Sequence, residues 1–175
     1  MTREGQQSGA AKAARTTAAW RAAGERGDAE AAGRCLAAGV QLISPLTARF
    51  SFRGAGQVQD VLSAALEVIS DISYHTEVGE GVTRALFYRG RCGDEQFEEA
   101  QLLRFDPDGL ITELTLFGRP LPGLTAVMAA IGPALLRRQG RPVVAGVVAA
   151  TTRPLAVLTR LGEAHVAPLV EPGRR

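Results

Sequence analysis

Cysteine is scarce in this chain, which has only Cys35 and Cys92. The two residues stand far apart in the sequence, without the closely spaced cysteine pairs that metal sites use. We therefore interpret both as free thiols and expect neither a metal nor another cofactor.

An excess of one charge is also lacking, because 20 Lys and Arg residues face 18 Asp and Glu residues. A net charge of +2 gives no general field that would gather nucleic acid or an anionic membrane. Seven of the basic residues follow position 136, but no aromatic side chains are interleaved with them as in a nucleic-acid platform. This pattern favours a solvated basic tail, and we expect no nucleic-acid partner and no membrane partner.

Long hydrophobic runs are missing as well. The first 20 residues carry charges and no continuous apolar stretch, so they indicate neither a signal peptide nor a membrane anchor. The longest uncharged stretch, residues 120–136, approaches the ~18 residues of a membrane span, but Pro120, Pro122 and Pro133 interrupt it. We expect a helix of a soluble protein there, and a cytoplasmic location.

Apolar residues are nevertheless abundant, at 46% of 175 residues, which is enough for one domain with a real core. Residues 1–11 are small and polar and predict a disordered leader. Two helices should follow, with Trp20 in the first and Asp28 as the N-cap of the second, and then two short strands. Their expected ranges are 12–24, 29–38, 40–44 and 49–53.

The middle of the chain has the clearest periodicity. Residues 54–70 carry apolar side chains on one face of an amphipathic helix. The segment Asp106-Pro107-Asp108-Gly109 specifies a β-turn, because it combines an Asx acceptor, a fixed proline φ and a glycine free to adopt positive φ. With two further glycine-containing turns it predicts an antiparallel meander. The four expected strands are 71–78, 82–91, 96–105 and 110–119.

The C-terminal third is predicted to be helical. One helix covers 124–131 and restarts at Pro133, and another covers 142–162, kinked or divided at Pro154. The second of these segments has too many apolar residues at helical spacing to remain solvated.

This order of elements, together with several short motifs, resembles a known family. The motifs are Ala19-Trp20 and Gly27-Asp28 in the first helices, Ser44-Pro45 before Phe52-Arg53-Gly54, Ala85-Leu86-Phe87 in the meander, and "LLRFDPDGLI" before "LFGRPL". In these features the chain resembles the nuclear transport factor 2-like superfamily and, within it, the SnoaL-like polyketide cyclase branch. The resemblance covers roughly residues 15–136.

The resemblance implies an α+β cone in which a curved, mostly antiparallel sheet wraps around helices and leaves a cavity at its wide end. We place this domain at residues 12–138 and a helical extension with a tail at 139–175. The extension should pack across the mouth of the cone or into a homodimer interface, and we favour a homodimer.

Period-two alternation predicts which side chains face that cavity. On the first meander strand it turns Tyr74 inward and His75 outward, although a His75–Tyr74 acid/base pair stays an alternative. On the third it turns Glu99 and Gln101 inward, with an exposed acidic pair at Glu98-Glu99 as the alternative. The expected ligand-contacting residues are Trp20, Tyr74, Phe87, Glu99, Gln101, Leu103, Leu114 and Leu116, with Trp20 equally compatible with a core position.

The resemblance implies several chemistries, and this chain departs from each. Epoxide hydrolase-like relatives use an Asp-Arg-Asp cluster, and one aspartate position corresponds to Leu116 here. SnoaL-type cyclases use an aspartate where this chain has Gln101, an amide that cannot move a proton. Ketosteroid isomerase-like relatives use a carboxylate base and a proton-donating partner, which Glu99 and Tyr74 imitate.

Two hypotheses therefore stay open. In the first, the protein binds a small apolar molecule without turnover, as Gln101, Leu114 and Leu116 favour. In the second, it is an isomerase, polyketide cyclase or epoxide hydrolase-like enzyme with Glu99 as base and Tyr74 as hydrogen-bond donor. The sequence leaves open whether the protein is an enzyme; orientation and titration of Glu99 separate the two.

Overall fold

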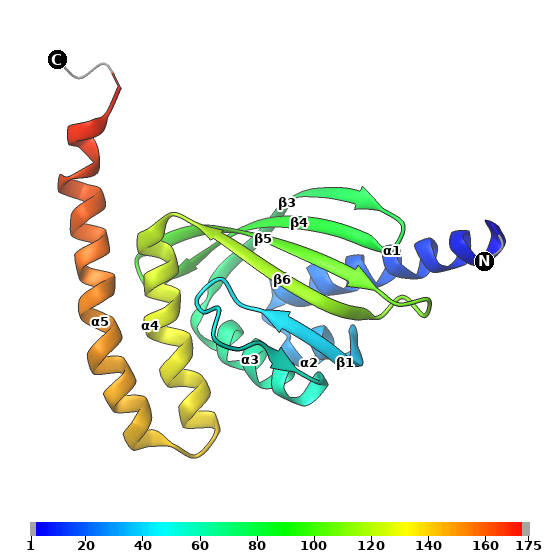
Figure 1. Cartoon of the computed structure of the whole chain (residues 1–175), viewed down its shortest axis with the longest axis horizontal. Coiled ribbons are helices and arrows are strands. Elements are labelled where there is room, and N and C mark those ends of the chain that lie inside the picture. Colours follow the sequence, from blue (N-terminus) through cyan, green and yellow to red (C-terminus); the bar gives the residue numbers. More distant parts are fainter. Residues whose placement is uncertain (1–2, 173–175) are drawn as a thin grey trace.

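The computed structural model describes residues 3–172 and consists of one six-stranded sheet with helices at its side and at one end (Figure 1). The helices are α1 (Arg3–Arg26), α2 (Ala29–Gly33), α3 (Ala55–Val68), α4 (Leu121–Arg138), α5 (Pro142–His165) and a short 3₁₀ helix (Ala167–Val170). The strands are β1 (Leu36–Ile43), β2 (Phe52–Arg53), β3 (Ser70–Glu80), β4 (Thr83–Cys92), β5 (Glu95–Phe105) and β6 (Ile111–Arg119).

The sheet has the order β2-β1-β6-β5-β4-β3. Strands β3 to β6 form the predicted antiparallel meander, and β1 adds to it by pairing in parallel with β6. The predicted α+β class, with a curved and mostly antiparallel sheet, is confirmed (Figure 1). Its core contains fully buried side chains from several strands, including Leu42, Leu86, Leu103 and Leu114.

The predicted turn at residues 106–109 joins β5 to β6 and also supports α1. The Gly109 amide donates to the Asp106 carbonyl at 2.9 Å, and the Leu110 amide donates to the Asp106 carboxyl at 2.9 Å. Gly109 has φ +80°, and a Cβ there would lie 2.5 Å from Lys12 Cβ. Glycine is required here for its backbone conformation and for the close approach of α1, which an Asp108–Lys12 ion pair at 3.1 Å reinforces.

The N-terminal leader prediction needs correction. α1 starts at Arg3, so residues 3–11, expected to be disordered, are helical, and residues 1–2 lie outside the described part. Alanine and glutamine outweigh Gly5 and Gly9 in helix propensity, and the contact of Lys12 with the β5–β6 turn anchors the middle of the helix.

The second helix is shorter than predicted. Asp28 caps it as expected, with its carboxyl accepting from the Ala31 amide at 2.8 Å, but α2 ends at Gly33. The Ile111 amide then donates to the Cys35 carbonyl at 2.8 Å, which draws the next residues into β1 beside β6. Pairing within the sheet therefore overrides the helical composition of residues 36–38.

The C-terminal segments form two long helices that lie side by side at one end of the molecule (Figure 1). α4 continues through Pro133, where a restart was predicted, and packs against α3 and the sheet. α5 packs on the outer side of α4, where the Thr125 and Thr159 hydroxyls lie 2.6 Å apart. α4 rather than α5 closes the cone, so the expected placement of the extension across the mouth is wrong. Its alternative placement in a homodimer interface stays a prediction.

Candidate ligand cavity

A cavity of about 430 Å³ lies between the sheet, α1, α3 and α4. Most of its wall is aliphatic or aromatic, because the inward positions of β3 to β6 and the apolar faces of α3 and α4 converge on it. The apolar lining includes Phe50, Phe52, Val61, Leu62, Leu66, Ile69, Ile72, Leu114, Leu116, Leu124, Val127, Met128, Ile131 and Leu135.

One part of the wall is polar, and it is built around Gln101 and Glu99 on β5. The Gln101 amide nitrogen donates to Glu99 Oε1 at 3.1 Å. The Gln101 amide oxygen accepts from Trp20 Nε1 at 2.8 Å and from the Tyr74 hydroxyl at 3.0 Å. All four side chains are at least nine-tenths buried.

Donor and acceptor chemistry fixes the direction of this network. An indole N–H can only donate, so Trp20 requires the oxygen of the Gln101 amide, and the nitrogen of that amide must then point to Glu99. Helix α1 supplies Trp20 and strand β3 supplies Tyr74. The orientation of Glu99 thus depends on residues from three separate elements.

Tyr88 on β4 is the other polar neighbour of Glu99. The two residues are direct partners across β4 and β5, on the face that lines the cavity. The Tyr74 and Tyr88 rings also pack together, with centroids 5.3 Å apart. Tyr88 therefore presents a phenol to the same carboxyl.

Burial raises the pKa of Glu99 to about 7, although hydrogen bonds from Gln101 and Tyr88 lower it in part. Desolvation and the nearby carboxylate also raise the pKa values of Tyr74 and Tyr88, which keeps both phenols protonated. At neutral pH the cavity holds a carboxyl close to half ionisation beside two phenol groups. Such a group can accept a proton and return it.

Six of the eight residues expected to contact a ligand line the cavity, namely Trp20, Tyr74, Glu99, Gln101, Leu114 and Leu116. The other two do not. Leu103 is fully buried in the core, and Phe87 lies on the opposite face of β4 from its neighbours Leu86 and Tyr88. Tyr88 lines the cavity but was not predicted to do so. Its inward position could have been inferred from Arg89 and Arg91, because these arginines mark the solvent-facing side of the strand and Tyr88 alternates with them.

The inward and outward assignments on β3 are as predicted. Tyr74 is buried, and His75 points to the other face, where its Nε2 lies 3.0 Å from Glu98 Oε1. Glu98 also pairs with Arg119, with Nε and Oε2 2.7 Å apart. His75 and Tyr74 therefore do not form an acid/base pair, and Glu98 and Glu99 face opposite sides of the sheet.

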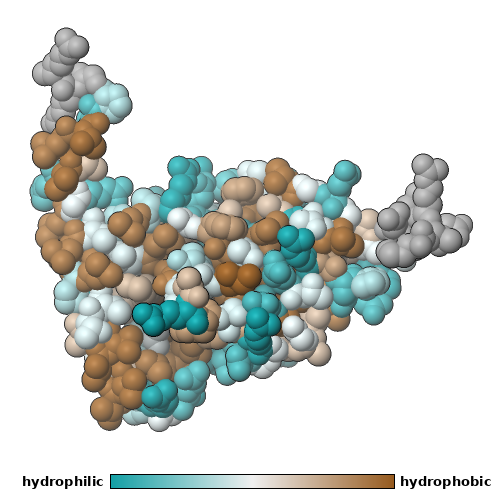
Figure 2. All heavy atoms as spheres, in the orientation of Figure 1, coloured by the Kyte–Doolittle hydropathy of each residue, from teal (hydrophilic) through white to brown (hydrophobic). Residues whose placement is uncertain are grey.

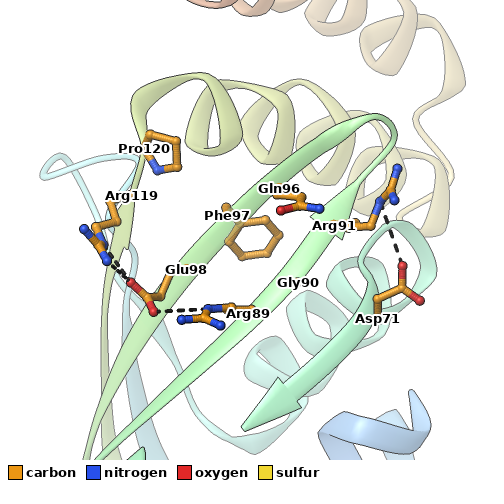
Figure 3. Close-up of a pocket in the computed structure, with 9 residues that line it drawn as sticks. All are labelled: Asp71, Arg89, Gly90, Arg91, Gln96, Phe97, Glu98, Arg119 and Pro120. Carbon is orange, nitrogen blue, oxygen red and sulfur yellow. Dashed lines mark hydrogen bonds and ion pairs between the residues drawn. The ribbon is translucent and has the colours of Figure 1, made fainter. Parts of the chain in front are cut away.

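A more open hollow of about 600 Å³ lies where β3 to β6 meet the start of α4 (Figure 3). Figure 3 shows Glu98 between Arg89 and Arg119, and Asp71 beside Arg91. Its charged groups pair with one another, and the Arg119 hydrogen bond lowers the pKa of Glu98. The charged groups that line this hollow are all paired, so the apolar cavity around Glu99 is the better candidate site.

No group of three His, Cys, Asp or Glu side chains suited to a metal ion occurs within residues 3–172. Cys35 and Cys92 are buried free thiols whose pKa values burial raises. Both thiols therefore stay protonated and unreactive.

The chain is similar to known proteins at the level of solved structures only. No family model matches the chain, and no curated protein matches it. Among solved structures, a steroid delta-isomerase from Pseudomonas aeruginosa is 29% identical with a TM-score of 0.65, over 77% of this chain and 96% of that one. A bacterial protein with a cystatin-like fold from Silicibacter pomeroyi is 25% identical with a TM-score of 0.64, over 67% and 82%.

A structure named for a SnoaL-like polyketide cyclase from a Jannaschia species is also similar. It is 15% identical with a TM-score of 0.55, over 70% of this chain and 93% of that one, which shows a shared fold. The regions matched are large in every case, and the three structures share the cone-like sheet.

Proposed function

Because this chain is a nuclear transport factor 2-like domain with a SnoaL-like cone, we propose that it binds a small apolar molecule in its cavity and transfers a proton on it with Glu99. The proposed reaction is of the isomerase or cyclase type, in the class named for the Pseudomonas aeruginosa steroid delta-isomerase. The observation that carries the proposal is a single carboxyl, with its pKa raised to about 7, in a mostly apolar cavity.

In the proposed reaction Glu99 removes a proton from a carbon next to a carbonyl group of the ligand and returns it to another carbon. The charge that develops on the carbonyl oxygen needs a hydrogen-bond donor. Tyr88 suits this role better than Tyr74, because its hydroxyl donates to Glu99, and that bond weakens when the carboxylate takes up the proton. The Tyr74 hydroxyl donates to the Gln101 amide oxygen at 3.0 Å, an acceptor that the proton transfer leaves unchanged. We assign Tyr74, together with Trp20, the role of positioning Gln101 and through it Glu99.

The test uses a cyclic β,γ-unsaturated ketone, because its conversion to the conjugated isomer is visible as a gain in ultraviolet absorbance. Glu99→Gln should lower kcat by about 10²- to 10⁴-fold, as expected for loss of a general base. The matched control is Glu98→Gln, since that neighbour lies on the other face of the sheet and should leave kcat unchanged. In the wild type, kcat/KM should rise with pH through about 7 as Glu99 ionises.

A second candidate function is binding without turnover. It is favoured by Gln101 and Leu116, which line the cavity. At these positions the resemblance to SnoaL-like and epoxide hydrolase-like relatives implies ionisable side chains. Trp20, the only tryptophan of the chain, lines the cavity and can report ligand binding by its fluorescence. In this case Glu99→Gln should leave affinity for an apolar ligand unchanged or improve it, because it removes a charge that burial penalises.

The two functions predict different results for Glu99→Gln. If Glu99→Gln keeps its activity on any ketone that the wild type isomerises, Glu99 is not the catalytic base. A wild type that binds such ketones but converts none of them, in a series of ring sizes, would favour the binding protein.

A further inference from the structure

Helix α5 has an apolar face with no partner in the described part of the chain. The face that contacts α4 consists mostly of small residues, among them Ala145, which is 1% exposed. The opposite face carries larger apolar side chains that are between 46% and 80% exposed, namely Val143, Val147, Leu158 and Leu161. Figure 2 shows this hydrophobic surface running along the end of the molecule that α5 occupies in Figure 1.

This segment passes the length and composition criteria of a membrane-spanning helix. The stretch Pro142–Val170 has 29 residues, and only 6% of its most apolar 18-residue segment is buried. A core helix can pass the same criteria but is mostly buried, and a signal sequence passes them near the N-terminus; α5 is neither.

Other contacts argue against α5 crossing the bilayer. Arg153 lies near its middle, where a charge would be costly at the bilayer centre. Ala145 near the start of α5 is buried, Thr159 contacts Thr125 of α4, and Arg160 pairs with Glu95 at 3.7 Å, so α5 is held against the domain from residue 145 to residue 160. These contacts suit a helix that lies in the plane of the interface, with one side on the domain and the other in lipid.

Basic residues border the apolar face. Arg153 and Arg160 are two turns apart and so share one edge of α5, while Arg137, Arg138 and Arg141 cluster at the turn from α4. Arg138 pairs with Glu67 at 3.6 Å and Arg160 pairs with Glu95, which leaves Arg137, Arg141 and Arg153 without an ion pair among the described residues. Positive charge around an apolar helix face is complementary to anionic lipid headgroups. Two copies of this chain pairing through the same face would bring these arginines together, which disfavours a second copy as the occupant.

We propose that the α5 face, defined by Val143, Val147, Leu158 and Leu161 and bordered by these arginines, docks on the surface of an anionic membrane. The apolar side chains would enter the boundary between headgroups and acyl chains, and Arg137, Arg141 and Arg153 would contact the headgroups. Binding of this kind needs both parts, because neither a few aliphatic side chains nor a few charges alone gives firm attachment.

The test is flotation of the full chain with vesicles of phosphatidylcholine and phosphatidylglycerol at 3:1, compared with pure phosphatidylcholine. The protein should float with the anionic vesicles at low salt, and less as salt is raised. One basic residue near an anionic surface strengthens binding about fivefold, so a variant with Arg137→Gln, Arg141→Gln and Arg153→Gln should bind about 100-fold more weakly. Its matched control carries Arg15→Gln, Arg26→Gln and Arg34→Gln, which are exposed on or near α1 and α2.

A second variant tests the apolar part. Val147→Ser, Leu158→Ser and Leu161→Ser together should abolish flotation with the anionic vesicles. The control replaces Val78, Val82 and Phe117, which are about as exposed on the sheet and its turn, by Ser and should float like the wild type. All variants alter exposed side chains, and unchanged circular dichroism spectra establish that each is folded.

Three results would overturn the proposal. The wild type could fail to float with the anionic vesicles at low salt. It could float equally with both vesicle types, with no effect of the arginine variant. Light scattering could show a dimer that the serine variant of α5 converts to a monomer while vesicles bind neither protein, which would identify a second copy as the occupant.

Discussion

The raised pKa of Glu99 should make the stability of the protein depend on pH in a defined direction. An ordinary glutamic acid has a pKa of 4.5, and Glu99 in the folded protein has one of about 7. Between these two values the folded state binds the proton more tightly than the unfolded state does. The free energy of unfolding must therefore fall as pH rises from 4.5 to 7 and level off above that range.

The size of this effect follows from the same two values. Each pKa unit corresponds to about 1.4 kcal/mol, so the full shift corresponds to about 3 kcal/mol, most of which lies between pH 5 and pH 8. Glu99→Gln removes the titration but keeps an oxygen that can accept from Gln101. The variant should therefore gain about 3 kcal/mol relative to the wild type as pH rises through this window.

The assay is urea unfolding of both proteins at several values between pH 5 and pH 8. Glu98→Gln is the control. Arg119 lowers the pKa of Glu98, so its contribution to stability is present above pH 4.5 and is lost only below it. A constant difference between wild type and Glu99→Gln across this range, within about 0.5 kcal/mol, would refute a buried Glu99 with a raised pKa.

Two further substitutions test the packing around the site. Gly109→Ala should destabilise the protein by about 2 kcal/mol or more, because Gly109 has φ +80° and a Cβ there would meet Lys12. The control Gly93→Ala should cost about 1 kcal/mol, because Gly93 has φ +60° but no atom lies near the added Cβ. Equal decreases in the urea midpoint of the two variants would contradict the close approach of α1. Trp20→Phe removes the indole donor that lies 2.8 Å from the Gln101 amide oxygen, so it should lower the free energy of unfolding by about 1 kcal/mol. It should also shift the pH at which activity appears. A change in stability without a shift in this pH would mean that Trp20 is only a core residue.

Much of the sheet was predictable because its signals are local. The turn at residues 106–109 and the alternation of β5 fix the register, so Glu99 and Gln101 face inward as expected. The strand order β2-β1-β6-β5-β4-β3 could not be predicted, because the parallel pairing of β1 with β6 joins segments about 70 residues apart in the sequence. No local pattern specifies such a contact, and the same pairing is what shortened α2.

The sequence predicted most residues of the candidate site but not the hydrogen bonds between them. Alternation places Tyr74, Glu99 and Gln101 on one face, yet it says nothing about which atoms meet. The hydrogen bond between Trp20 and Gln101 joins residues 81 positions apart, through a helix whose placement only the tertiary packing sets. Phe87 was assigned wrongly for a different reason, because it was taken from a motif, whereas Arg89 and Arg91, which share its face of β4, mark that face as solvent-facing.

Net charge is a poor guide to the surface of this protein because it averages over the whole chain. A value of +2 hides the fact that α4, α5 and the turn between them carry five arginines and one glutamate. A lipid surface interacts with the local arrangement, which screening limits to about 10 Å. The expectation of no membrane partner rested on the average, whereas the proposal rests on the arrangement.

The glutamine at position 101 appeared from the sequence to weigh against catalysis, and its contacts change that argument. An aspartate there would place a second carboxyl within reach of Glu99, and two such groups cannot both ionise easily. An amide has no charge, and it can donate to a carboxylate while it accepts from two other groups. Gln101 does both, so it holds Glu99 in place and favours its ionised form, which the apolar cavity disfavours. Replacing the acid at one position by an amide thus leaves a single carboxyl whose pKa lies near neutrality, which is the condition that proton transfer at neutral pH requires.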